Sequence, residues 1–437
     1  MFLPWEDTRR LVKLLDLRHP LGEGLHLSPQ TFYRQSVEDA PALHKLQHYL
    51  SRGAYRRCRK RFGQCFRRRS LRRLRRDPIQ RAFYLGNIRA HSVFVTPSLR
   101  QHRHQHLVRC LLLNAGVTTT VDTSQVSHTP AHSDACITGL KESGRRAVYT
   151  YSPGLGPGSQ YPKDLLRLKT QYFSSTDQLL TLELNAAPNA DNWVLARQAS
   201  VPIICHIVGD RSGNFEAIGK AGLMGPDNEY IHCTQLSETH WKMIADTGGK
   251  VSIAPAIEMQ MRHGMPPLQT ALDHGIQPSL SVDVECNMTA DMFTIMRTTF
   301  TLQRALVNER SLAGEENLPS LLTCRDVIEM ATIAGARAAH LDHKIGTLSP
   351  GKEADIIMLG ADRINVFPLN NVPGTVVTLM DTSNVDTVFV AGKVAKWHGS
   401  LVGVDLGRLR RMIEKSRDGV LARAGYAADL FGTCCRT

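Results

Sequence analysis

The sequence predicts an α/β protein built as a (β/α)8 TIM-type barrel that lacks a normal first strand and carries a small appended β-sandwich domain. Between Val201 and Glu285, short runs rich in Val and Ile, each closed by a polar residue, recur about every 20 to 30 residues, as buried parallel strands alternating with helices do. Beyond residue 344 the runs are joined by tight turns, which is typical of antiparallel sheets.

Seven barrel strands are expected, and a closed barrel of this kind has eight. The missing strand should precede Asn114. Helices are expected between the strands, and one of them opens at Ser237, a residue type that favours helix N-termini. The strands should end near Asp122, Ser152, Ala187, Val208, Gln235, Ala256 and Val284, and the helices should span 131–143, 192–199, 215–221, 237–246, 267–274, 291–304 and 324–339.

The C-terminal part predicts a strand after the turn at residues 349–351 and a hairpin that turns at Ala391 and Gly392. A surface helix is expected over 406–422. We therefore divide the chain into four parts: an arginine-rich segment at 1–105, a barrel at 106–343, a β-sandwich portion at 344–400 and a helical tail at 401–437.

The net charge of +13 comes from one segment. Residues 51–110 contain 17 Arg and one Lys against a single acid, Asp77, so the rest of the chain carries a net charge of −4. The arginine run at 51–81 is compatible with a nucleic-acid-binding arm. We favour a solvated, disordered tail, and nucleic acid is not the partner we expect.

Composition also indicates the cellular compartment and the class of partner. The ten cysteines include no CxxC pair, a pattern that indicates reduced thiols rather than a disulfide framework. No apolar run approaches the roughly 20 residues that a membrane span needs, and the N-terminus lacks the layout of a secretory signal. We predict a cytoplasmic protein with a small-molecule substrate and no membrane partner; a homo-oligomer is left open.

Three side chains near the ends of the predicted strands form a candidate metal site: His206, His232 and Asp283. The C-terminal ends of parallel barrel strands face one mouth, so these residues should converge. Two imidazoles and a carboxylate suit a catalytic zinc or iron. A single histidine at a strand end is more often a hydrogen-bonded structural residue than a metal ligand. The hypothesis therefore rests on three candidate ligands that lie at corresponding positions of three strands.

Residues 107 to 400 resemble the amidohydrolase superfamily, in particular the cytosine-deaminase-like branch with triazine hydrolases and S-adenosylhomocysteine deaminases. The resemblance is carried by LNAGVTTTVD, by His206 and His232 at consecutive strand ends, by PAIEMQMRHGMPPLQTALDHGIQPSLSVD followed by DMFTIMR, and by GTLSPGKEADIIML. It implies a metal-centred barrel with a composite β-sandwich that hydrolyses C–N or C–Cl bonds of heterocycles, most often by deamination.

The resemblance also implies roles for individual residues. On the eight-strand count, His206 on the fifth strand would bind the metal, and His232 on the sixth would contact the metal-bound water or the substrate. Asp283 on the eighth would ligate the metal and accept the proton of the water, whose pKa a divalent ion lowers toward about 7. Glu258 and His263, in a loop after the seventh strand, would shape the substrate pocket; a loop salt bridge is an equally good interpretation of both.

Two departures from the family pattern matter. The family's metal-binding HxH pair belongs to the first strand, but the only HxH sequences here lie at 102–106, inside an Arg/His-rich run, and we interpret them as accidental. Deaminases carry a proton-shuttling Glu three residues after His206, where this chain has Gly209; Asp210 could substitute. We hypothesise that residues 1 to about 105 do not encode the family's own N-terminus, through a shifted reading frame, a mis-joined exon or a real replacement. A catalytically impaired relative stays an alternative to an active hydrolase.

Overall fold

The computed structural model describes residues 107–108, 110–175, 177–209, 213–284 and 288–424. The predicted disorder of the arginine run at 51–81, and the interpretation of the HxH sequences at 102–106, fall outside the described residues. No helix among the described residues is long and apolar enough to cross a membrane. The division into domains at residues 105, 343 and 400 stays a prediction.

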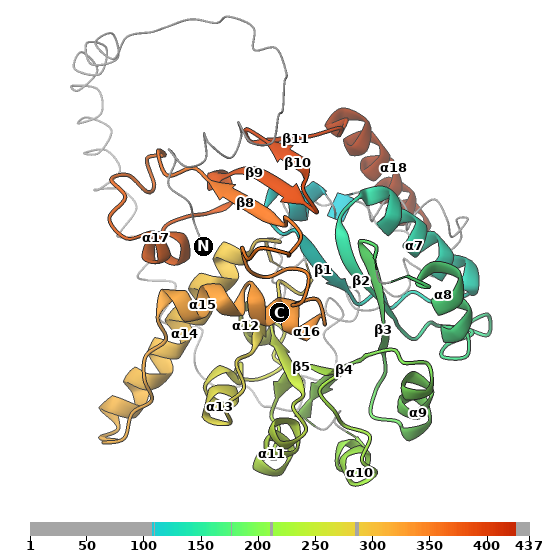
Figure 1. Cartoon of the computed structure of the whole chain (residues 1–437), viewed down its shortest axis with the longest axis horizontal. Helices are drawn as coiled ribbons and strands as arrows, with labels where there is room; N and C mark the ends of the chain where they lie inside the picture. The colour runs from blue at the N-terminus through green and yellow to red at the C-terminus, as the bar shows by residue number, and fades with distance from the viewer. Residues whose placement is uncertain (1–106, 109, 176, 210–212, 285–287, 425–437) are drawn as a thin grey trace, which may run out of the picture. The chain divides into compact units, whose positions relative to one another are not determined.

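The larger sheet is parallel and curled, with its strands in the order β1 to β7 (Figure 1). Each strand pairs with its sequence neighbours in a parallel register, for example Cys205 opposite Tyr230. This confirms the seven predicted strands of an α/β fold. Because the family's first strand is not among them, each strand number here is one lower than in the family's eight-strand count. The strands are β1 (Thr119–Asp122), β2 (Arg146–Tyr151), β3 (Leu180–Asn185), β4 (Ile203–Val208), β5 (Asn228–Thr234), β6 (Lys250–Ile253) and β7 (Ser279–Leu280).

Helices connect successive strands, and two of the predicted ones begin with a side-chain cap. Ser237 accepts a hydrogen bond from the His240 amide at the start of α11, and Asp291 caps α14 in the same way. The helices of this region are α7 (Pro130–Ser143), α8 (Leu165–Tyr172), α9 (Ala190–Gln198), α10 (Phe215–Lys220), α11 (Glu238–Asp246), α12 (Pro255–Gln260), α13 (Leu268–Asp273), α14 (Met292–Leu312), α15 (Cys324–Met330) and α16 (Ile333–Ala338).

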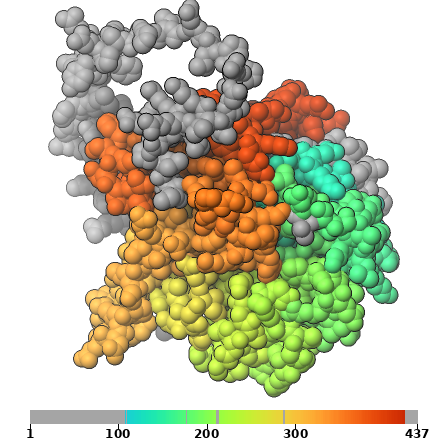
Figure 2. All heavy atoms as spheres, in the orientation of Figure 1, coloured from blue at the N-terminus to red at the C-terminus, as the bar shows by residue number. Residues whose placement is uncertain are grey.

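Two predicted helices differ from the structure. The helix expected at 324–339 is two helices, because Thr332 has φ −130° and ψ −90°, outside the helical region, and its hydroxyl donates to the Ile328 carbonyl. The helix expected to end at residue 304 continues to Leu312, which is 84% exposed. The C-terminal end of α14 projects from the surface (Figure 2).

The smaller sheet is antiparallel, with the order β11–β10–β9–β8. Its central hairpin turns at Ala391 and Gly392, which have φ values of 47° and 76°, as a two-residue turn between twisted strands requires. The expected sandwich is a single sheet among the described residues. It comprises β8 (Ile356–Leu359), β9 (Val385–Val390), β10 (Lys393–Trp397) and β11 (Ser400–Leu401), followed by α18 (Leu406–Ala424); α17 (Val372–Thr378) and a short 3-10 helix, η2 (Thr382–Asn384), lie between β8 and β9.

A buried ion pair joins the two sheets. The Arg146 guanidinium at the start of β2 donates two 2.9 Å hydrogen bonds to the Asp355 carboxylate, just before β8. Asp355 also accepts from the Thr119 hydroxyl at 3.3 Å and from the Ala391 amide at 2.9 Å. The Arg146 and Asp355 side chains are 0% and 4% exposed, so each charge depends on the other.

We expect Arg146→Met to lower the free energy of unfolding by about 3–5 kcal/mol, because the buried Asp355 carboxylate loses its cation. Urea unfolding followed by circular dichroism measures the change. The double variant Arg146→Met/Asp355→Leu should be more stable than the single variant; a double variant equally unstable would contradict the assignment. Arg417→Met removes an exposed guanidinium and should leave stability unchanged.

Two buried carboxyl groups of the curled sheet form no salt bridge with a described residue. Glu183 of β3 and Glu229 of β5 are 2% and 3% exposed, and both Glu183 oxygens lack a hydrogen-bond partner among the described residues. Burial raises the pKa of Glu229 to about 7, against a hydrogen bond from Ser252 that lowers it. Burial, and then repulsion from Glu229, raise the pKa of Glu183. The folded chain therefore binds protons that the unfolded chain releases.

This pair should make stability fall as the pH rises. Both folded-state pKa values are raised, so the stabilisation is fully present below about pH 4.5, the ordinary value, and is lost as the pH rises through about 7. Glu229→Gln should flatten that slope and make the chain more stable than wild type at pH 8, by about 3 kcal/mol. The free energies of unfolding at pH 5 and pH 8 test this, with Glu309→Gln, at an exposed side chain, as control. If the free energy of unfolding of Glu229→Gln falls with pH as steeply as that of wild type, the prediction is wrong.

Candidate active site

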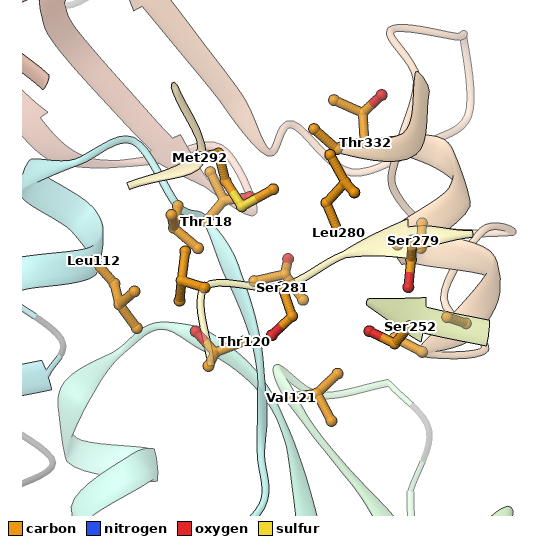
Figure 3. A pocket seen from close by; sticks show the side chains of 18 of the residues that line it. Leu112, Thr118, Thr120, Val121, Ser252, Ser279, Leu280, Ser281, Met292 and Thr332 are labelled. Carbon is orange, nitrogen blue, oxygen red and sulfur yellow. The ribbon is translucent and has the colours of Figure 1, made fainter. Parts of the chain in front are cut away.

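The three predicted metal ligands lie around one cavity. His206 is in β4, His232 is in β5 and Asp283 is three residues beyond β7. All three line a cavity of about 540 Å³. Residues of β1 and β7 also line it, among them Thr120 and Leu280 (Figure 3). The parallel sheet thus brings together side chains that are 77 positions apart in the sequence.

His206 and His232 are neighbours, with ring centroids 5.7 Å apart and planes at 56°. Burial, followed by the nearby imidazoles of His232 and His263, lowers the pKa of His206 to about 4. The ring is therefore neutral at physiological pH, and it retains a nitrogen lone pair. A neutral imidazole is the form that ligates metals.

Glu258 orients the His232 ring. It lies in α12, which opens with Pro255 in its first turn, and its side chain is completely buried. Its Oε1 atom is 3.1 Å from His232 Nδ1 and accepts the Ala254 amide at 2.9 Å. Because Oε1 is an acceptor, we assign the His232 proton to Nδ1, which leaves a lone pair on Nε2.

Asp283 faces that lone pair. Its Oδ2 atom is 3.9 Å from His232 Nε2, beyond direct hydrogen-bond distance. Burial raises the pKa of Asp283, against the opposing effect of His232, so the carboxyl is more basic than an exposed aspartate. A cation between the two atoms would interact favourably with both the carboxylate and a neutral imidazole.

His263 and Gln235 close one side of the site. The His263 ring meets the His232 ring edge to face, with centroids 4.9 Å apart, and its carbonyl accepts a 2.7 Å bond from the Gln235 side chain. Gly209 has φ +46°, and a Cβ there would lie 3.1 Å from Gln235 Oε1. The backbone at the position where deaminases carry Glu therefore favours glycine. Asp210 lies outside the described residues.

Unusual backbone conformations cluster at this end of the sheet. His232, Cys233, Gln235 and Asp283 all have φ between 54° and 70°, a region that costs non-glycine residues about 1–3 kcal/mol each. The pairing of β4 with β5 also shifts register after Ile207. Local strain of this kind is concentrated at functional sites, where surrounding packing maintains it.

The donor set fits a divalent metal in its chemistry. A neutral His206, the Nε2 lone pair of His232 held by Glu258, and the Asp283 carboxylate are the donor types that zinc prefers. In the described part of the chain, however, no three His, Cys, Asp or Glu side chains are grouped closely enough to hold a metal ion. The assignment of His206, His232 and Asp283 as ligands of zinc or iron therefore stays a prediction.

Comparison with protein families identifies the family of this chain. The model of the Amidohydrolase family matches residues 81–395, well over half of the chain. The chain belongs to the amidohydrolase family. The match begins upstream of residue 107, so the resemblance extends further toward the N-terminus than the sequence motifs indicated.

Curated relatives of this amidohydrolase include deaminases. The chain is 28% identical over 250 residues to a 5'-deoxyadenosine deaminase of Methanothermobacter thermautotrophicus, covering 56% of this chain and 53% of that protein. It is 29% identical over 200 residues to a 5-methylthioadenosine/S-adenosylhomocysteine deaminase of Desulfitobacterium hafniense, covering 46% and 44%. The aligned part spans about half the length of these relatives.

Solved structures share the fold of the amidohydrolase. An adenosine deaminase from Xanthomonas campestris with bound zinc superposes with a TM-score of 0.67 at 19% identity, over 79% of this chain and 81% of that chain. The atrazine chlorohydrolase TrzN from Arthrobacter aurescens TC1, complexed with zinc, gives 0.65 at 16% identity, over 80% and 84%. At these identities the likeness shows the fold alone.

Sequence reasoning placed Glu258 near the pocket but in a loop; the structure places it in a helix, bonded to His232. The Ala-Pro pair before it was the available signal, since proline favours the first turn of a helix. Gln235 and the buried acid Glu229 were missed, because a lone Gln or Glu in a strand carries no motif. The roles of Glu258, His263 and Asp210 in substrate binding stay predictions.

We expect Glu258→Ala to lower the free energy of unfolding by about 1–3 kcal/mol, because the buried Ala254 amide loses its acceptor. Glu258→Gln keeps an acceptor oxygen and should lose less. Thermal unfolding of the two variants beside wild type measures the order, with Glu238→Ala, at an exposed side chain, as control. Equal losses in Glu258→Ala and Glu258→Gln would contradict the acceptor role.

Proposed function

We propose that this amidohydrolase hydrolyses a C–N bond of a small nitrogenous or heterocyclic substrate, in the manner of a metal-dependent deaminase. The observation that carries the proposal is the 3.9 Å separation between His232 Nε2 and Asp283 Oδ2, which sets two acceptors around a space that suits a cation. The deaminase activities of the curated relatives supply the reaction class.

Each residue has a part in this chemistry. A zinc or iron ion held by His206, His232 and Asp283 would supply Lewis acidity and lower the pKa of water. Asp283, made more basic by burial, would accept a proton from the attacking water. Glu258 would keep the His232 ring in one orientation and one tautomer, and His263 would border the substrate from the α12 side.

The substrate class follows from the relatives rather than from the cavity. 5'-Deoxyadenosine, 5-methylthioadenosine and S-adenosylhomocysteine are the compounds named for them. The cavity lining combines hydroxyls and aliphatic groups, such as Thr120 and Leu280, with ionisable side chains, such as Arg145, Glu229 and Asp283.

We expect the purified chain to bind about one zinc or iron ion, and Asp283→Ala and His206→Ala to lower its affinity at least tenfold. Metal analysis after dialysis against a weak chelator measures this. His398→Ala removes an imidazole that is 65% exposed on the small sheet and should change nothing. Equal metal content in wild type and both site variants would overturn the proposed ligands.

Ammonia release from the three adenine nucleosides and from triazines then tests catalysis. Turnover that Asp283→Asn abolishes would support the hydrolase. Site-specific metal binding without turnover of any of these compounds would instead favour the catalytically impaired relative, whose distinguishing feature is glycine at position 209.

A further inference from the structure

The side chain of Gln235 joins two backbone segments beside the site. Gln235 directly follows β5 and has φ +60°, a conformation that is unfavourable for a residue other than glycine. Its Nε2 atom donates a 2.7 Å hydrogen bond to the His263 carbonyl, in the loop after α12. Because a carbonyl only accepts, this bond assigns the NH2 group of the side chain to the His263 side and Oε1 to the other.

Two glycines leave room for this side chain. A Cβ atom at Gly264 would lie 3.3 Å from both Cγ and Nε2 of Gln235, and a Cβ atom at Gly209 would lie 3.1 Å from its Oε1. These separations are shorter than ordinary van der Waals contacts of carbon. Gly264 also has φ +118°, which favours glycine. The Gln235 amide therefore fits closely between the loop after β4 and the loop after α12.

His263 is held at both of its backbone polar groups. Its amide donates to the Glu258 carbonyl at 3.0 Å, and its carbonyl accepts from Gln235. The Glu258 side chain contacts His232 Nδ1 at 3.1 Å. Glu258 therefore holds His232 through its carboxylate and His263 through its backbone. The two imidazole rings meet with centroids 4.9 Å apart and planes at 74°.

The exposure of Gln235 distinguishes it from the buried residues around it. Gln235 is exposed, whereas His232 and Glu258 are 4% and 0% exposed. A hydrogen bond from an exposed side chain adds little to global stability. This bond nevertheless joins residues 28 positions apart, and the loop that carries His263 cannot move away from β5 while it is intact. Its main effect is on geometry.

We propose that Gln235 is a positioning residue, which fixes the His263 ring against His232 and so shapes one wall of the substrate pocket. The positioning stands on the contacts alone. Its effect on turnover rests on the proposed function, in which His263 borders the substrate and Asp283 accepts the proton. Loss of the Gln235 amide then weakens substrate binding and leaves the chemical step almost unchanged.

Gln235→Met tests the bond, because it keeps the length of the side chain and removes the donor without adding a charge. The His263 amide should exchange with deuterium about fivefold faster than in wild type, as the loss of one hydrogen bond predicts. The NMR signals of the His263 ring protons, assigned with His263→Asn, should shift because the ring contact with His232 loosens. The melting temperature should stay within about 3 °C of wild type.

Gln235→Glu replaces the donor by a carboxylate that repels the His263 carbonyl, so it should change the exchange and the ring signals at least as much. It decides the question if Gln235→Met does not fold. Gln198→Glu carries the same change of charge at an exposed residue of α9 and should alter neither measurement. Wild-type exchange at His263 or unchanged ring signals in the Gln235 variants would overturn the proposal.

Kinetics separate this inference from the proposed function. On any adenine nucleoside or triazine that wild type turns over, Gln235→Met should raise KM about fivefold and change kcat less than about twofold. A fall in kcat at unchanged KM would assign Gln235 to the chemical step and overturn its positioning role. If wild type turns over none of these compounds, the proposed function fails, and the exchange and ring signals still decide whether Gln235 positions His263.

Discussion

The Asp355 carboxylate is the interaction on which the arrangement of the sheets depends. It accepts hydrogen bonds from Arg146 of β2, from Thr119 of β1 and from the Ala391 amide of the small sheet. The edge strand β1 lacks a neighbour on one side among the described residues, so this buried anion helps to hold it in place. Lys396, itself buried, adds a 2.7 Å bond to the Asn114 carbonyl, so the small sheet also supports the turn that leads into β1.

The site at the other end of the strands combines strain with buried polar contacts. His232 and Asp283 both have positive φ, and Glu258 holds the His232 ring from behind. The hydrogen bond between Glu258 of α12 and His232 of β5 therefore restricts the orientation of the His232 ring. If these residues bind the proposed cation, this restriction would lower the cost of binding, because the His232 ring would not have to reorient.

Much of this arrangement was accessible from periodicity and residue type. The seven strands, the Ser237 cap and the Ala391–Gly392 turn follow from local chemistry, and the proposed ligands His206, His232 and Asp283 were selected because they lie near predicted strand ends. The interruption of the 324–339 helix at Thr332 could not be predicted from the sequence, because no proline or glycine marks it. The contact between Glu258 and His232 was missed because it joins residues 26 positions apart, at a distance set by packing.

The sequence by itself determined the alternation of strands and helices, the membership of the amidohydrolase family and the identity of the candidate ligands, since each depends on residue type and spacing. Only the tertiary structure decided which polar groups meet: Arg146 with Asp355, His232 with Glu258, and residues of β1 and β7 around one cavity. These contacts depend on sheet curvature and helix packing, which many residues determine together and no short motif encodes.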